Sequence, residues 1–332
     1  YSFRILEIKK KINFKFSKAF KNFINSRISK DLFYTKSLID DEIVVNISRI
    51  ILGLILVNRL INIGPFLLAL DNDFEIVLGF WIQTILSFLF LIGFLTPLTS
   101  ISLLLTNLKI SMLTSTYTLG IDVANMMILG MIIFPAGKIL SIDSIFIDKN
   151  KKFIIGIYEF FSHSNKKYQV YLSKFLPFLS YVLLCLFSGL EHLSDTLWTS
   201  GDVGPFLITS SYMSQYPFFF QELISSNSNF LNLLRIVLLI MMAWYFVLLP
   251  FYYLGSIFRF FIIIWGLLFF LISGFVLQLG SLAWIELIFW VYLFWPYFLR
   301  SKIFKQKSIN VLYDDKCNLC DKTVNFLNFL DI

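Results

Sequence analysis

Long apolar segments alternate with short polar ones through most of the chain between residues 43 and 299. A helix of ~20 apolar residues crosses a bilayer core of ~30 Å, and runs of about that length recur here. The pattern predicts eight membrane-spanning helices: Ile43–Pro65, Ile76–Leu95, Leu98–Ser115, Leu119–Pro135, Leu172–Leu190, Leu231–Tyr252, Phe258–Leu277 and Leu282–Leu299. The third and fourth are shorter and richer in Ser, Thr and Asn. We therefore predict an all-α integral membrane bundle of about eight transmembrane helices.

The composition excludes the soluble alternatives. Hydrophobic residues make up 58% of the 332 residues and charged residues only 15%, whereas soluble domains carry ~25% charged residues. This much apolar side chain cannot be hidden inside two small globular domains. Disorder is excluded for the same reason, and three cysteines are too few for a disulfide-stapled secreted domain.

The net charge of +7 is concentrated in three basic clusters, at residues 1–39, 138–174 and 300–307. No Lys or Arg lies between Arg59 and Lys109, or between Lys174 and Arg235. With eight spans, all three clusters fall on one side of the membrane, which the positive-inside rule assigns to the cytoplasm. We predict cytoplasmic termini, a bacterial cytoplasmic (inner) membrane, and anionic lipids rather than nucleic acid as partners of the basic residues.

Two segments outside the spans have membrane character. Residues 1–40 place Phe16, Phe20 and Ile24 at helical spacing among lysines, which indicates an interfacial amphipathic helix or a solvated basic tail, and not a signal peptide. The segment Glu191–Phe230 is semi-apolar and contains two prolines, so it is a poor spanning helix. It is interpreted as a re-entrant or interfacial segment over an external cavity.

Four landmarks in residues 41–300 carry a family resemblance. They are Arg49–Gly53, Leu91–Thr96, Phe134–Pro135 with Gly137-Lys138 and Ser141–Asp143, and Gly189–Leu193 with Trp198 and Gly201. In this order they resemble the HTTM domain, the membrane domain of vitamin K-dependent gamma-carboxylase-like proteins. The resemblance implies a membrane-embedded enzyme or maturation factor that acts on a lipid, a quinone or a secreted peptide.

The chain departs from that family at the implied catalytic base. Where carboxylases carry lysines in this segment, one of them the base, the present chain has Glu191 and His192. A neutral imidazole can accept a proton near pH 7, so these two residues form a candidate external site. Carboxylase activity itself is not expected, because the base differs.

A second resemblance begins after the last span. Residues 308–332 open with "SINVLYDDKCNLC", which resembles the start of the DCC family of thiol-disulfide oxidoreductases, a thioredoxin-like group. In a CxxC motif between strand and helix, the helix N-terminus stabilises a thiolate on Cys317, and Cys320 resolves the mixed disulfide. A thioredoxin-like domain needs on the order of 100 residues, so this α/β fragment is expected to be incomplete.

Several ionisable residues fall inside the predicted spans, among them Arg49, Arg59, Lys109, Asp122, Arg235 and Glu286. Such groups usually face the interior of a bundle and pair there. Arg49, Lys109 and Arg235 lie near predicted helix ends, where long side chains can instead reach the headgroups. The other three predict an internal polar cluster or structural ion pairs.

Three functions remain open from the sequence. The first is a membrane domain fused to a thiol-disulfide oxidoreductase, the second the maturation enzyme described above, and the third a non-catalytic scaffold or transporter. No cofactor is evident beyond a quinone or lipid, and a metal site is not expected, because no second Cys/His pair accompanies the CxxC motif. Nucleotide-binding, nucleophile-elbow and zinc-protease motifs are also missing from the sequence.

Overall fold

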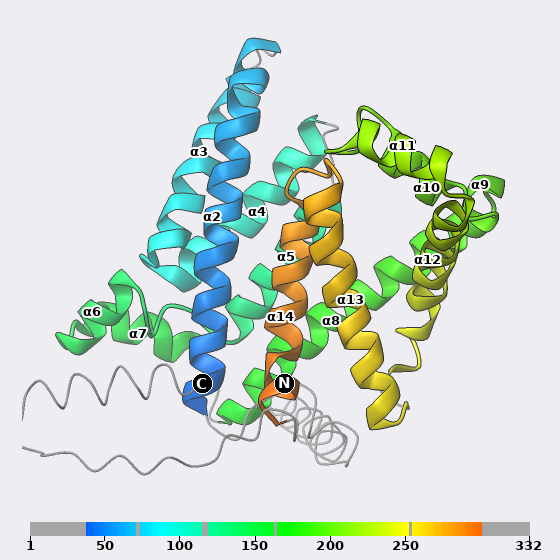
Figure 1. Ribbon diagram of the computed structural model, residues 1–332. Coiled ribbons are helices and arrows are strands. Elements are labelled where there is room, and N and C mark those ends of the chain that lie inside the picture. Colours follow the sequence, from blue (N-terminus) through cyan, green and yellow to red (C-terminus); the bar gives the residue numbers. More distant parts are fainter. Residues whose placement is uncertain (1–37, 71–73, 115–118, 163–164, 252–253, 301–332) are drawn as a thin grey trace, which may run out of the picture.

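The computed structural model describes residues 38–70, 74–114, 119–162, 165–251 and 254–300. Within these ranges the chain is all-helical (Figure 1), apart from turns and an isolated β-bridge between Ser214 and Leu277. The predicted all-α class is confirmed for this part of the chain. The α/β fragment predicted at residues 308–332, with Cys317 and Cys320, lies outside the described residues, as does most of the basic segment 1–40.

Each of the eight segments predicted to span the membrane is a helix. They are α2 (Leu38–Leu70), α3 (Phe74–Ile92), α4 (Thr96–Thr114), α5 (Leu119–Ile133), α8 (Lys166–Leu193), α12 (Ser228–Val247), α13 (Ser256–Val276) and α14 (Leu282–Arg300). Five of them, α2, α3, α8, α12 and α13, contain stretches long and apolar enough to cross a membrane. Helices α5 and α14 contribute shorter apolar stretches, and α4 is interrupted by Thr, Ser, Asn and Lys. The findings support a multi-pass helical membrane protein.

Shorter helices connect the long ones. Helices α6 (Ile142–Asp148) and α7 (Lys152–Phe161) precede α8, in a segment for which the sequence indicated only a basic cluster. Helix α7 buries Ile154 and Tyr158 on one face and exposes Phe153 and Phe160 on the other, as a helix lying along a membrane surface would. Helices α9 (Thr196–Thr199), α10 (Val203–Thr209) and α11 (Pro217–Ser226) fill the segment predicted to be re-entrant or interfacial.

These connecting helices gather at opposite ends of the bundle (Figure 1). Helices α6 and α7 lie beside the start of α2 and the end of α3, which we call the α7 end. Helices α9 to α11 lie beside the start of α12 and the turn between α13 and α14, which we call the α11 end. The α7 end is the side that the charge pattern predicts to be cytoplasmic.

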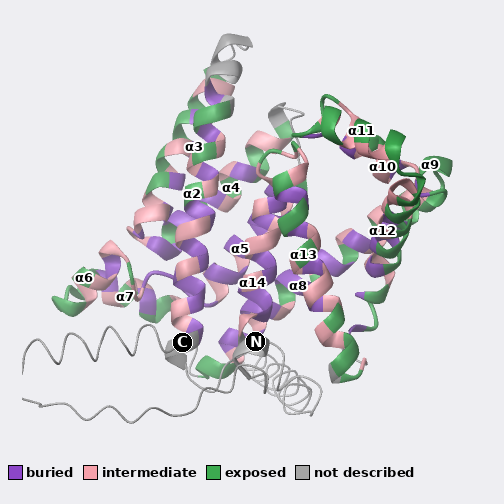
Figure 2. Ribbon diagram, viewed as in Figure 1, coloured by how far each residue is buried: buried purple, intermediate pink, exposed green. Residues whose placement is uncertain are grey.

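Helices α5 and α14 occupy the centre of the bundle, and each packs against the other (Figure 2). Trp290 of α14 is fully buried, and its indole Nε1–H donates to the carbonyl oxygen of Ile263 at 2.9 Å. Gly266 makes room for that ring, since a Cβ there would lie 2.9 Å from it. Tyr292 is also fully buried, and its hydroxyl donates to the carbonyl oxygen of Ser173 at 3.0 Å.

Polar contacts also join the helices. They matter in a bilayer because lipid tails solvate a leucine side chain about as well as the protein interior does, so apolar burial alone would hold the helices together only weakly. Lys174 of α8 and Asp41 of α2 form an ion pair at 2.9 Å with both side chains fully buried. Gln83 Nε2–H donates to Asn107 at 2.6 Å, and Asn107 Nδ2–H donates to Asn125 at 2.8 Å. This row of amides links α3, α4 and α5.

Candidate functional site

The helices at the α11 end form a roof that is fixed to α12. Between α9 and α10, Gly201 adopts a φ of 83°, and a Cβ there would lie 2.8 Å from the carbonyl oxygen of Arg235. Glycine is therefore required for both conformation and space. A Cβ on Gly204 would likewise lie 2.9 Å from the carbonyl oxygen of Leu234. The two glycines let α10 lie directly on the backbone of α12.

An ion pair between Asp202 and Arg235, which we call the clamp, also holds the start of α10 against α12. Arg235 Nε–H donates to the Asp202 carboxylate at 2.7 Å, and the Ser200 hydroxyl donates to the other oxygen at 2.7 Å. The hydrogen bond from Ser200 and the bond and charge of Arg235 lower the pKa of Asp202 below its ordinary value. Both charged side chains remain partly exposed.

The roof is also hydrogen-bonded to α13. Gln215 N–H donates to the carbonyl oxygen of Val276 at 2.8 Å, and Gln278 N–H donates to that of Met213 at 2.8 Å. The Gln278 side-chain amide adds a bond to the carbonyl oxygen of Ser214 at 3.0 Å. The connector between α10 and α11 is thus attached to the end of α13.

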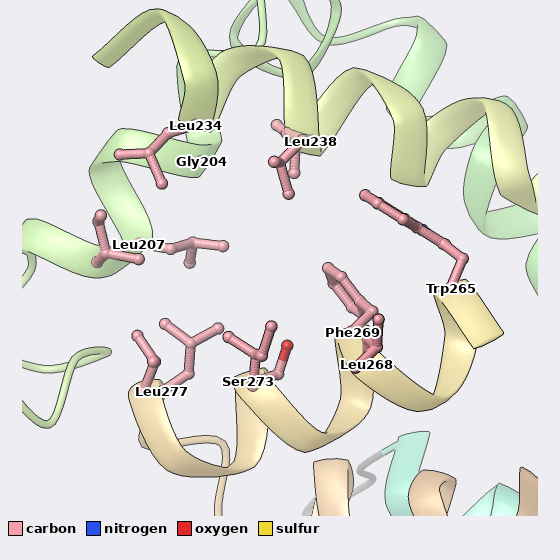
Figure 3. A pocket seen from close by; sticks show the side chains of 13 residues that line it. Gly204, Leu207, Leu234, Leu238, Trp265, Leu268, Phe269, Ser273 and Leu277 are labelled. Atoms are coloured by element: carbon pink, nitrogen blue, oxygen red, sulfur yellow. The ribbon is translucent and has the colours of Figure 1, made fainter. Parts of the chain in front are cut away.

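Beneath this roof lies a cavity of about 290 Å³ between α10, α12 and α13, which we call the slot (Figure 3). Its lining is almost entirely apolar: Gly204, Leu207, Ile208, Leu234, Val237, Leu238, Trp265, Leu268, Phe269, Ile272, Ser273, Val276 and Leu277. Leu268 and Ile272 are exposed, so the slot opens onto the surface of the bundle.

Ser273 supplies a polar interruption of this lining. The Trp265 ring also lines the slot, and its buried indole Nε1–H has no hydrogen-bond acceptor among the described residues. The Ser273 hydroxyl makes no hydrogen bond with a described residue, and Figure 3 shows it turned toward the gap. A ligand with one acceptor group could satisfy a donor that the protein leaves unpaired.

The structure does not bring His192 and Glu191 into the slot. The His192 ring stacks on Trp198, with ring centroids 3.7 Å apart, and its Nε2 lies 3.2 Å from the Ser188 hydroxyl. Glu191 is exposed. Neither residue lines the slot, so the expected cavity beside His192 is not the one found beneath the roof. The stacked pair sits at the end of α8, where it also packs near Tyr245.

The intramembrane charges have separate environments rather than one polar cluster. Arg49 is fully buried and donates to the carbonyl oxygens of Phe90, Leu91 and Leu140. Lys109 faces Glu75 at 3.9 Å with both side chains largely exposed. Glu286 accepts a hydrogen bond from the Tyr181 hydroxyl at 3.2 Å. Asp122 is half-buried on α5.

Arg59 is the exception among these charges. It is half-buried and makes no hydrogen bond or ion pair with any described residue. It lines a second cavity, of about 490 Å³, between α2 and the turn that joins α13 to α14. The sequence identified Arg59 as a charge inside a span. It could not predict this cavity, because the cavity combines α2 with a turn that is distant in sequence.

A buried hydrogen-bond cluster at the α7 end was not expected from the sequence. The Asp143 carboxylate accepts from Leu95 N–H and Thr96 N–H at 2.7 Å each, from the Thr96 hydroxyl at 2.9 Å and from the Tyr158 hydroxyl at 2.8 Å. Burial and the Asp143 charge raise the pKa of Tyr158 well above its ordinary value. The signal was present, since Thr96 and Asp143 belong to the landmarks quoted above.

Those landmarks meet in space. A Cβ on Gly93 would contact Arg49 and Ser141, and a Cβ on Gly137, whose φ is 101°, would collide with Thr96 and the Tyr158 hydroxyl. Every acceptor position on Asp143 is used by these donors. The cluster therefore fixes the ends of α2, α3 and α4 against α6 and α7, and it is structural rather than catalytic in form.

Comparison with known proteins adds no assignment: no protein family, no curated protein and no solved structure matches this chain. The resemblances to HTTM and DCC proteins therefore stay predictions. Among the described residues there is no group of three or more His, Cys, Asp or Glu placed to hold a metal ion.

Proposed function

We propose that this multi-pass membrane protein binds a membrane amphiphile, a lipid or quinone, whose apolar tail occupies the slot beneath α10. The observation that supports the proposal is the construction of the slot. Its roof is attached to both walls, to α12 through Asp202–Arg235 and to α13 through Gln215 and Gln278. A cavity built in this way keeps its shape without a partner.

The size and lining of the slot favour a tail over other occupants. A volume of about 290 Å³ is near the lower limit of the ~300–1,000 Å³ usual for small-molecule sites. A partner helix, ~10 Å in diameter, would need a wider groove. Each buried methylene contributes ~0.8 kcal/mol when it leaves water; inside a bilayer that gain is largely cancelled, so selectivity must come from shape and from Ser273.

Photocrosslinking tests the proposal. The purified full chain in nanodiscs would be illuminated with a diazirine-bearing phosphatidylcholine or a diazirine-bearing isoprenoid quinone, and adducts would be located by mass spectrometry. We expect adducts on the lining residues of α12 and α13, and the more efficient probe identifies the class of amphiphile.

A slot-filling variant provides the control. Leu207→Trp should reduce slot adducts several-fold, because the indole would occupy the cavity. Ile236→Trp, at an exposed position of α12 outside the lining, should leave them unchanged. Equal labelling in the two variants, or adducts spread evenly over the lipid-facing surface, would show that the slot is ordinary lipid-exposed surface.

The redox function proposed for Cys317 and Cys320 rests on their motif. One structural fact favours a cytoplasmic location: α14 ends at the α7 end, on the predicted cytoplasmic side, so the chain continues from there. In a full-length chain, alkylation rates against pH would be compared for Cys320→Ser and Cys317→Ser. The proposal requires Cys317 to react at lower pH than Cys320, as the first thiol of such a motif does.

A further inference from the structure

The second cavity lies at the α11 end, where Arg59 of α2 faces the turn between α13 and α14. Its walls are Ile55, Asn58, Arg59 and Asn62 from one side and Leu279, Gly280, Ser281, Leu282 and Trp284 from the other. Gly280 has a φ of 60° and open space where a Cβ would stand.

The chemistry of this lining is cationic and rich in donors. Arg59 supplies a guanidinium with five N–H groups, the Asn58 and Asn62 amides supply two N–H groups each, and Ser281 supplies a hydroxyl. Among the described residues, no Asp or Glu lines the cavity. Such a set is suited to an oxyanion, because guanidinium binds phosphate and carboxylate oxygens in a bidentate manner.

Arg59 differs from the other cations of the long helices in the partners available to its charge. Arg49 donates to carbonyl oxygens, Lys174 pairs with Asp41, and Arg235 pairs with Asp202. Arg59 has no such partner among the described residues, although burial opposes its charge. An ionised group in a membrane protein normally faces a partner, water or a ligand. Because no described residue supplies that partner, an anionic ligand is the partner that the donors lining the cavity fit best.

The depth of the cavity identifies the source of that anion. Its wall is the turn at which α13 ends and α14 begins, and turns between spanning helices lie at the level of the lipid head groups. Arg59 lies three residues before Asn62, where the apolar stretch of α2 ends. At this level the most abundant oxyanion is the phosphate of a lipid.

We propose that this cavity binds the phosphate of an anionic phospholipid, with Arg59 as its charge partner and Asn58, Asn62 and Ser281 as hydrogen-bond donors. The site is separate from the slot beneath α10 and shares no lining residue with it. Failure of one proposal therefore leaves the other intact.

A binding assay on the purified full chain in detergent micelles tests this proposal. The probe is a short-chain fluorescent phosphatidylglycerol, and its dissociation constant is measured for the wild type, Arg59→Gln and Lys109→Gln. Loss of a charge-assisted, bidentate contact should weaken binding roughly tenfold or more in Arg59→Gln. Lys109→Gln is the matched control: it removes one exposed positive charge and should change binding less than twofold.

Two milder variants cover the case in which Arg59→Gln does not fold. Arg59→Lys keeps the charge but loses the planar fork, and Asn62→Ala removes one donor, so each should weaken binding by several-fold. Wild-type binding in both variants, or an equal loss in Lys109→Gln and Arg59→Gln, would overturn the proposal.

Competition separates the sources of phosphate. Unlabelled phosphatidylglycerol should displace the probe at much lower concentration than phosphatidylcholine, whose choline neutralises the head group, and inorganic phosphate should not displace it at millimolar concentration. Displacement by inorganic phosphate as effective as that by the lipid would show that the ligand is a soluble phosphate, and the lipid proposal would be wrong.

Discussion

Removing Lys174 should destabilise the bundle far more than removing any exposed cation. Lys174 Nζ lies 2.9 Å from Asp41 Oδ1, and neither side chain is accessible. Lys174→Met would leave the Asp41 carboxylate buried without its ammonium partner. Breaking a buried pair from one side costs about 3–5 kcal/mol, which is a large part of the stability of a typical domain.

The same protein contains a suitable reference pair. Lys109 Nζ lies 3.9 Å from Glu75 Oε2, and the two side chains are 70% and 65% exposed. An exposed pair contributes about 0–1 kcal/mol. Lys109→Met should therefore be nearly neutral, although it makes the same chemical change as Lys174→Met.

Unfolding in mixed micelles of dodecyl maltoside and dodecyl sulfate would give the free energies of both variants. The double variant Asp41→Asn/Lys174→Met should recover part of the loss, because no buried charge remains, and the double-mutant cycle then gives the coupling energy. If Lys174→Met cost no more than Lys109→Met, or if the double variant were as unstable as the sum of the single ones, the assignment of a buried, interdependent pair would be refuted.

Three further predictions concern the two ends of the bundle. Asp143→Asn should cost at least about 2 kcal/mol in the same unfolding assay, because a carboxylate acceptor surrounded by donors becomes an amide with its own N–H groups. The clamp between Asp202 and Arg235 should loosen in acid: the folded pKa of Asp202 is lowered, so its contribution is complete above the unfolded pKa of ~3.9 and is lost as pH falls through the lower folded value. Hydrogen exchange of α10 amides, corrected for intrinsic rates, should rise below pH ~4 in the wild type but not in Asp202→Asn. Single cysteines at Ser200 and Ser164, in a chain without native cysteines, should react oppositely with an impermeant maleimide in intact cells; equal labelling would contradict the predicted topology.

The helices could be predicted because membrane thickness sets their length. All eight predicted segments are helical, and the largest errors in the bounds have local causes. Pro65 was taken as the end of the first span, yet α2 continues to Leu70. Helix α8 begins earlier than its apolar part, at the cap formed by Asn165, whose side chain accepts from Tyr168 N–H. A hydropathy pattern contains no information about such caps.

The cavities could not be predicted, because residues distant in sequence form each of them. The slot needs Gly204, Leu238 and Phe269 on three helices to face one another, and the second cavity needs Arg59 to face Ser281. Sequence spacing identifies the face of a helix but not the neighbour opposite it. His192 illustrates this limit: its chemistry made it a candidate base, whereas its position is set by stacking on Trp198.

The landmark residues show how a family-like pattern can arise from structure alone. Thr96, Gly137 and Asp143 recur among the motifs that suggested an HTTM domain, and they meet in one buried cluster at the α7 end. Because donors saturate Asp143, no proton or ligand site remains there. A likeness carried by these residues can therefore persist in chains that differ in chemistry, and function has to be sought where polar groups are left unpaired. In the described part of this chain, two places where polar side chains without a partner line a cavity are the slot, with Ser273, and the cavity beside Arg59, both formed by the helices and turns of the α11 end.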